Sequence, residues 1–242
     1  SETSFSSKIV KLLKSNIDLI YLPILAIITF YSAQFIVGVP MLIILGSDTL
    51  KTPLIATIFS VLVYSLSFTF LLFALKHIKP LKDPVTRNEL GLKDLITFSD
   101  IGLAVAGFFG YLAFSAILTA LFSVFPWFNL AENQPLLYST LISPLNKVFA
   151  AIALVVFGPI LEEVIYRGLI YGKLRKKHSL VTSILIVSIL FGFLHGQWNV
   201  AVDVFALSVV ACLMRETTGT IYAGIVLHML KNTIAFYLIF MA

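Results

Sequence analysis

The chain has a single cysteine, Cys212, and few charged residues. One cysteine excludes an intrachain disulfide and any metal centre built from several cysteine ligands. Only 12% of the 242 residues are charged and 59% are apolar, whereas about a quarter of the residues in a soluble globular protein are charged. This composition excludes a soluble globular protein and indicates a polytopic membrane protein.

Long apolar runs define the expected fold. A helix that crosses a bilayer needs about 20 mostly apolar residues. The chain has seven runs of low charge, or eight if the first is broken at Pro23 or Pro40, and they cover residues 17–45, 54–75, 101–125, 147–172, 180–196, 200–214 and 219–240. The sequence therefore predicts one all-α integral membrane domain over residues 1–242, a transmembrane helical bundle of seven or eight spans.

The basic residues report topology. They are spread over the segments between the runs and form no single basic patch, so no nucleic-acid partner is expected. Most of them precede the first run or follow the second, fourth and sixth, while the loops between hold only Lys51 and Lys147. Under the positive-inside rule this alternation places the N-terminus in the cytoplasm.

Ionisable and amide side chains are rare in the runs before residue 147 and gather in those after it. Charged groups at membrane depth are costly and usually functional. We therefore expect the active site in a cavity among the C-terminal helices, within a core of about residues 150–235. The asymmetry also counts against a transporter built from two repeats. The later runs contain Glu162, Glu163, Arg167, His195, Asp203, His228, Lys231 and Asn232.

The adjacent glutamates are expected to have different roles. Glu163 and Arg167 are four residues apart and share a helix face, so we predict an internal ion pair that gives structural support. Glu162 points about 100° away and is left free. An unpaired glutamate in an apolar site is a candidate general base or acid. Gly158 and Pro159, just upstream, should loosen the helix.

Two further groups of residues carry candidate chemistry. His195 lies between Gly192 and Gly196, a pair of small residues that allows another helix to come close. His228 and Asn232 are four residues apart, so both could donate hydrogen bonds toward one point, as an oxyanion hole requires. A hydrogen-bonded core histidine and interhelical hydrogen bonding remain the structural alternatives.

The depths of these groups agree only in part. At 1.5 Å per residue, Glu162 and His228 lie roughly 15 and 14 Å along their runs, whereas His195 comes out roughly 22 Å deep. The fifth helix must therefore tilt, begin later, or deliver its histidine from above.

Three ordered segments together carry a family resemblance. They are Gly158-Pro159-Ile160-Leu161-Glu162-Glu163-Val164-Ile165-Tyr166-Arg167-Gly168, then Phe191-x-x-x-His195, then Thr218-Gly219-Thr220-Ile221 leading to His228-x-x-x-Asn232. This order resembles the CPBP family of CAAX proteases and bacteriocin-processing enzymes, also called Abi, which includes the Rce1-type prenyl-protein endopeptidases.

The resemblance implies a glutamate-dependent intramembrane protease with no cofactor. By position, Glu162 would activate the hydrolytic water together with His195, while His228 and Asn232 would stabilise the oxyanion. The polar segment 197–199 departs from the apolar continuation expected after the histidine.

The resemblance also implies a substrate and a location. In Rce1-type members the substrate is a C-terminal CAAX tail whose cysteine carries an isoprenoid, and cleavage removes the last three residues. The expected partners are therefore a peptide or prenylated protein and membrane lipids, in a prokaryotic cell membrane. A bacteriocin-immunity or regulatory protein that acts on or binds non-prenylated peptides is the alternative within the family.

Other functions remain open from the residues. Glutamate and histidine also bind zinc, although the zinc-protease motif His-Glu-x-x-His is lacking. A non-catalytic protein that sequesters a lipid, peptide or bacteriocin is a second alternative. A proton or ion pathway along Glu162, His195 and Asp203 is a third, but Asp203 is expected near an outer helix end in contact with solvent. Lys231 should snorkel, find a carboxylate or contact a substrate carboxylate.

Overall fold

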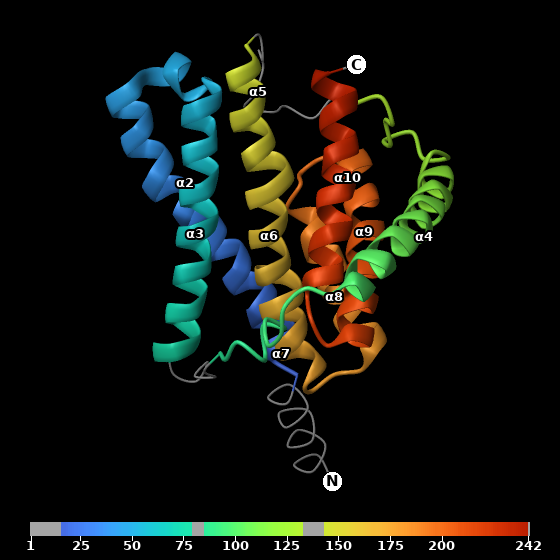
Figure 1. Cartoon of the computed structure of the whole chain (residues 1–242). Coiled ribbons are helices and arrows are strands. Elements are labelled where there is room, and N and C mark those ends of the chain that lie inside the picture. Colours follow the sequence, from blue (N-terminus) through green and yellow to red (C-terminus); the bar gives the residue numbers. More distant parts are fainter. Residues whose placement is uncertain (1–15, 79–84, 133–142, 242) are drawn as a thin grey trace.

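The computed structural model describes residues 16–78, 85–132 and 143–241, and none of these lies in a strand (Figure 1). The predicted all-α fold is confirmed. The lysines before the first run and most of the loop that precedes Pro144 lie outside the described residues. The elements are α2 (Asp18–Leu50), α3 (Pro53–His77), α4 (Phe98–Phe122), α5 (Pro144–Ala151), η1 (Ile152–Phe157), α6 (Gly158–Glu163), η2 (Val164–Tyr171), α7 (Gly172–Arg175), α8 (Leu180–Phe193), α9 (Trp198–Thr218) and α10 (Tyr222–Phe240).

The fourth predicted span is one long rod. Its elements α5, η1, α6, η2 and α7 follow each other without a break over the 32 residues Pro144–Arg175. The rod, α2, α3, α4 and α10 are the five helices of the described chain that are long and apolar enough to cross a membrane. The shorter apolar helix α8 and the helix α9 bring the described bundle to seven helices. Pro23 and Pro40 both lie inside α2, so the first run is not divided at either proline.

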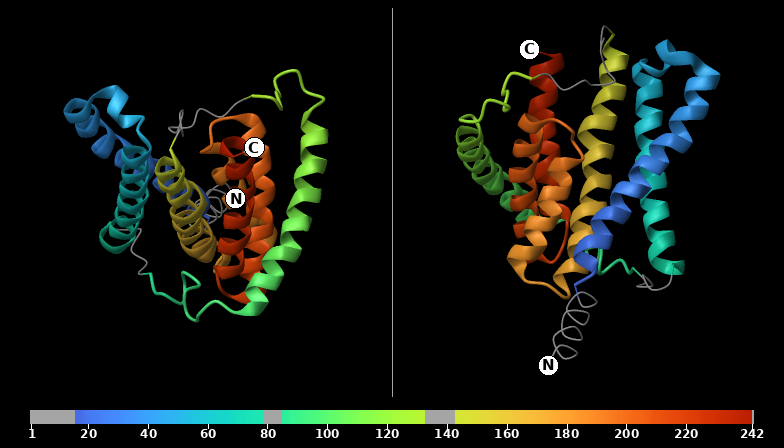
Figure 2. Two further views of the ribbon diagram at one scale, coloured as in Figure 1. Left: turned by 45° about the horizontal axis from the view of Figure 1, so that its top comes forward. Right: turned by 180° about the vertical axis from the view of Figure 1, so that it is seen from behind.

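The rod stands between two groups of helices. Figures 1 and 2 show α2 and α3 on one side, α8, α9 and α10 on the other, and α4 tilted along the outer edge. The α3 helix packs against α5, η1 and α6, while α10 packs against η1 and α6, and α4 covers α9 and α10. The middle of the rod is therefore enclosed from both sides.

Helix ends follow local chemistry. Pro53 opens α3, where its missing N–H costs nothing. Thr97 and Asp100 form a capping box at the start of α4, each side chain accepting from the other's backbone N–H. Gly219 ends α9 with φ 71°, a left-handed conformation that glycine adopts without strain.

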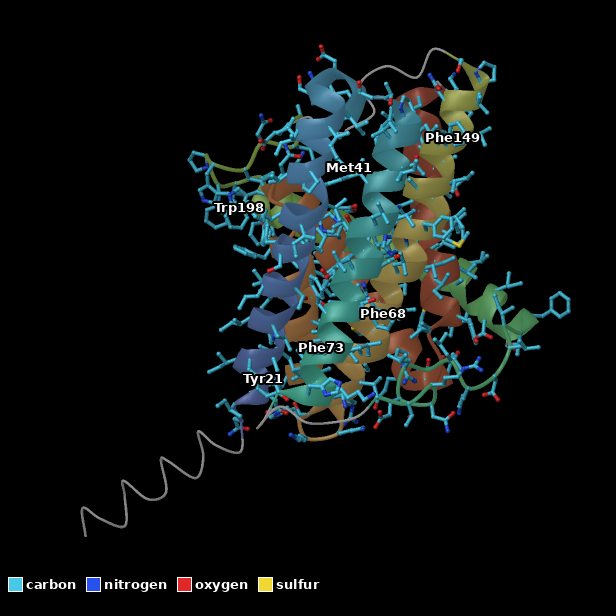
Figure 3. All side chains as sticks on the ribbon, turned by 90° about the vertical axis from the view of Figure 1, so that its left-hand side faces the viewer. Tyr21, Met41, Phe68, Phe73, Phe149 and Trp198 are labelled. Carbon is cyan, nitrogen blue, oxygen red and sulfur yellow. The ribbon has the colours of Figure 1, made fainter. Side chains whose placement is uncertain are left out.

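The outer faces of the helices are apolar. Phe35 and Ile43 on α2, Phe73 on α3 and Phe109 on α4 are all exposed, and Figure 3 shows the α2 and α3 side with its side chains. A soluble monomer rarely exposes so much contiguous apolar surface. These faces are therefore the ones that meet lipid.

The connector between α3 and α4 is seated on the rod. A Cβ added at Gly168 would lie 2.9 Å from the carbonyl oxygen of Leu90, and one added at Gly172 would lie 2.9 Å from that of Glu89. Arg215 on α9 donates from Nη2 to the same Glu89 oxygen at 3.0 Å. The two glycines thus allow backbone-to-backbone contact at this end of the molecule.

Candidate active site

A cavity of about 300 Å³ lies beside α6. The structure brings the four predicted catalytic residues, Glu162, His195, His228 and Asn232, to its wall. The cavity lies among the C-terminal helices, where the site was expected, and α2 and α3 complete its wall. The lining residues from these two helices are Phe30, Ser60 and Tyr64.

The predicted pairing of Glu163 with Arg167 is present. Arg167 Nη1 lies 3.1 Å from Glu163 Oε1, and both side chains are fully buried. The guanidinium also lies over the ring of Phe191, 4.4 Å from its centroid, in a cation–π contact. A buried charge is tolerated when it is paired, so this pair accounts for one of the two glutamates.

The helical spacing predicted that Glu162 would have no partner, but the structure gives it two polar neighbours. The Tyr64 hydroxyl donates a hydrogen bond to Glu162 Oε1, and His228 Nε2 lies 3.7 Å from Oε2. The side chain is buried but lines the cavity. Each carboxylate oxygen therefore has a polar neighbour, one from α3 and one from α10.

His228 contacts both glutamates. Its Nδ1 lies 2.9 Å from Glu163 Oε1 while its Nε2 faces Glu162. A carboxylate only accepts hydrogen bonds, and Glu163 is held as an anion by Arg167, so Nδ1 carries the proton in this contact. Nε2 is then an acceptor in the neutral ring and a donor only when the ring is protonated. The predicted oxyanion role of His228 thus requires the imidazolium form.

Asn232 is positioned by a defect in the rod. The N–H of Gly158 donates to Ala153, five residues back, in a π-helical turn. Leu154 would need a donor from Pro159 to continue that pattern, and proline has no N–H. Asn232 Nδ2 donates to the Leu154 carbonyl instead, at 2.8 Å. This bond uses one of the two amide protons and leaves the other available at the cavity.

His195 enters the cavity from a loop. The α8 helix is 14 residues long and ends at Phe193, before the predicted boundary at residue 196. Gly196 has φ 75°, which turns the chain toward α9. His195 lines the same cavity as Glu162 and His228 from the loop beyond the end of α8, which is one of the three arrangements that the mismatch in depth allowed.

The contacts of His195 fix its tautomer. Nδ1 lies 2.7 Å from the carbonyl oxygen of Phe191. Because a carbonyl only accepts, Nδ1 carries the proton, and Nε2 of the neutral ring is an acceptor. The predicted close helix approach holds for Gly192, where an added Cβ would lie 2.9 Å from the carbonyl oxygen of Ala201. It does not hold for Gly196, where an added Cβ would meet nothing within 4 Å.

A second polar cluster lies beside the cavity. Asp203 Oδ1 accepts from the Tyr111 hydroxyl at 2.6 Å and from Ser115 Oγ at 2.8 Å. Its Oδ2 lies 3.3 Å from Lys231 Nζ. Lys231 pairs with a carboxylate, as predicted. Asp203 keeps part of the expected solvent contact, since its side chain is 29% exposed, and it also has partners on α4 and α10.

Sequence reasoning missed Tyr64. Its hydroxyl is the polar contact from α3 to Glu162, yet in the sequence it is one aromatic residue within an apolar run. Tyrosines are common in membrane helices, especially near the interfaces, so the residue type alone gave no signal. Only the packing of α3 on α6 identifies it.

The described residues hold no group of three or more His, Cys, Asp or Glu side chains placed to bind one metal ion. A catalytic zinc takes three protein ligands. The side chains as they lie do not offer that set.

The comparisons with known proteins cover part of the chain. Residues 144–234 match the family model described as type II CAAX prenyl endopeptidase Rce1-like. The chain is also similar to a protein of Bacillus subtilis (strain 168) named "Putative membrane peptidase YdiL", with 32% identity over 145 residues, 59% of this chain and 57% of that protein. The chain thus spans little more than half the length of that relative. No solved structure matches it.

The matched segment contains the rod, α8, α9 and most of α10. It therefore includes the three motifs and every predicted catalytic residue. The resemblance to the CPBP family is confirmed, and residues 144–234 are an Rce1-like region of a multi-pass membrane protein.

Proposed function

We propose that this protein is a glutamate-dependent intramembrane endopeptidase that removes C-terminal tripeptides from prenylated CAAX proteins. The Rce1-like region and the name of the Bacillus relative support a membrane peptidase. The observation that carries the mechanism is the pair of adjacent glutamates. Glu163 is fully buried and neutralised by Arg167, whereas Glu162 lines the cavity.

Glu162 acts as the general base. It accepts a proton from the hydrolytic water while the water oxygen forms a bond to the scissile carbonyl carbon. The Nε2 atom of His195 is the second acceptor for this water, because Nδ1 is already bonded to Phe191. Collapse of the tetrahedral intermediate breaks the carbon–nitrogen bond, and Glu162 returns its proton to the leaving amine.

The oxyanion is stabilised from α10. The free amide proton of Asn232 is one donor, and Nε2 of protonated His228 is the other. Glu163 lies behind His228 at 2.9 Å and stabilises its positive charge. Two donors at a developing oxyanion in a site shielded from water are each worth roughly 100- to 1,000-fold in rate.

The walls of the cavity suit a lipid-modified peptide. Apolar residues from α2, η1, α8 and the turn after it, and α9 share the lining with the polar group. An isoprenoid can partition among such side chains. These lining residues include Phe30, Leu154, Phe191, Leu194, Val200 and Val204. We propose a prokaryotic cell membrane as its location, with the N-terminus and the lysine-rich loops in the cytoplasm.

The test is a cleavage assay on a farnesylated CAAX peptide with the purified protein in liposomes. The wild type should release the tripeptide and Glu162→Gln should not, while its circular dichroism spectrum and melting temperature stay close to those of the wild type. Glu132→Gln is the matched control, because Glu132 is exposed and does not line the cavity. Cleavage by Glu162→Gln, or none by the wild type, would contradict the proposal.

A chelator tests the absence of a cofactor. Activity should survive incubation with 1,10-phenanthroline, because the proposed base is a carboxylate and not a metal-bound hydroxide. Loss of activity that added zinc restores would replace this mechanism with that of a zinc protease.

A further inference from the structure

Lys231 is a cationic side chain in the cavity wall that the proposed mechanism does not use. It lies on α10 between His228 and Asn232, and of the described residues that line this cavity it is the one lysine or arginine. A charged side chain at membrane depth is costly and usually functional. Its position therefore points to an interaction inside the cavity.

The carboxylate that pairs with Lys231 stands outside the cavity. Asp203 is not among the lining residues, and Tyr111 and Ser115 on α4 hold its Oδ1. The remaining Oδ2 lies 3.3 Å from Lys231 Nζ, longer than the 2.7–2.9 Å typical of a strong charge-assisted hydrogen bond. An ammonium group has three protons to donate. Asp203 thus holds the lysine from one side and leaves donors for an anion in the cavity.

We propose that Lys231 binds the C-terminal carboxylate of the peptide substrate and so measures the length of the fragment that is released. The inference rests on the proposed peptidase function and assigns a specificity-determining residue to it. The anchor pairs a lysine ammonium with a substrate carboxylate, and Asp203 orients the lysine.

The spacing along α10 sets that length. His228 and Lys231 are three residues apart, so their Cβ atoms are neighbours at roughly 5–6 Å, and the lysine side chain extends this reach. An extended peptide advances about 3.3–3.6 Å per residue. A carboxylate bound at Lys231 while the scissile carbonyl lies near His228 therefore belongs to a tail of one to three residues.

The experiment compares three forms of one farnesylated CAAX peptide with the wild-type protein. These are the free acid, the C-terminal carboxamide, and a peptide extended by two residues beyond the tripeptide. We expect kcat/KM for the carboxamide to be roughly 10- to 100-fold lower than for the acid, mainly through KM, because a hydrogen bond between charged groups is lost. The extended peptide should be cleaved at least about 10-fold more slowly for the same reason.

Variants assign the effect to the lysine. Lys231→Met should lower cleavage of the acid to the level of the carboxamide and leave the carboxamide unchanged, while Lys231→Arg should retain a preference for the acid. Lys147→Met is the matched control, because Lys147 does not line the cavity. It should preserve the wild-type ratio.

Failure of this inference can be told apart from failure of the peptidase function. Equal cleavage of acid and carboxamide by the wild type would overturn the carboxylate anchor and leave the peptidase standing. A preference for the acid that survives Lys231→Met would overturn the role of Lys231. If the wild type cleaved none of the three peptides, both the proposed peptidase function and the carboxylate anchor would be overturned.

Discussion

The Rce1-like region and the helices before it contribute differently to one cavity. Residues 144–234 carry the motifs and all four predicted catalytic residues. The helices α2, α3 and α4 carry no motif, yet Tyr64 reaches Glu162 and Tyr111 holds Asp203. One region thus carries the proposed reacting groups, while the other supplies hydrogen bonds to Glu162 and Asp203. Four substitutions test this division, two in each region.

Glu162→Gln should have the largest effect. Loss of the general base is expected to lower kcat/KM by roughly 1,000-fold or more, with little change in stability because the amide is nearly isosteric. Steady-state kinetics on the farnesylated peptide measure it. If Glu162→Gln lowered kcat/KM no more than Tyr64→Phe does, the reacting group would not lie in the Rce1-like region alone.

Arg167→Met should have the largest effect on stability. It leaves the Glu163 carboxylate fully buried without its partner, which typically costs about 3–5 kcal/mol. Thermal unfolding in detergent measures the loss. Combining it with Glu163→Gln should recover a large part of the stability, since no unpaired charge then remains, whereas a single variant that melts like the wild type would contradict the buried pair.

Tyr64→Phe tests the contribution of the region without motifs. Removing the donor to Glu162 should lower kcat by about 10-fold, the value of one hydrogen bond to a charged group, with KM and melting temperature almost unchanged. Tyr31→Phe is the control, because Tyr31 lies on α2 outside the cavity lining. An unchanged kcat for Tyr64→Phe would confine the chemistry to the Rce1-like region.

Glu89 in the connector should have the smallest effect. Burial alone would raise the pKa of its carboxyl, but hydrogen bonds from Lys176 and the Thr86 backbone N–H outweigh burial and hold the pKa below the ordinary value of 4.5. This stabilisation is present above pH 4.5 and is lost as the pH falls below it.

The Glu89→Gln variant measures that contribution. Because the pair is partly exposed to solvent, which screens it, the variant should melt at most about 2 °C below the wild type at pH 7. The difference should disappear at acid pH. A difference that grew as the pH fell would contradict the sign of the shift.

Local spacing explains what could be predicted from the sequence. Glu163 and Arg167 contact each other because they are four residues apart on one helix. The helix itself is predicted by the long apolar run in which the two residues lie. The three motifs, read in order, also placed His195 and His228 at one site before any geometry was known.

The remaining features depend on contacts between distant segments. The bond from Tyr64 to Glu162 joins residues 98 positions apart, and no periodicity specifies such a pair. The level of His195 depends on where α8 stops, and the partners of Asp203 on α4 depend on how that helix tilts across the bundle. These are properties of packing, which a single sequence does not display.

Pro159 controls an amide that belongs to another helix. Because proline has no backbone N–H, it cannot donate to the Leu154 carbonyl oxygen, and the Asn232 side chain donates to that oxygen instead. This hydrogen bond fixes the rotamer of the Asn232 amide. A residue with a backbone N–H at position 159 would donate to the Leu154 oxygen itself. The Asn232 amide would then lose its acceptor and could adopt other rotamers. The direction in which the proposed oxyanion donor points is thus set by the absence of one backbone proton on a neighbouring helix.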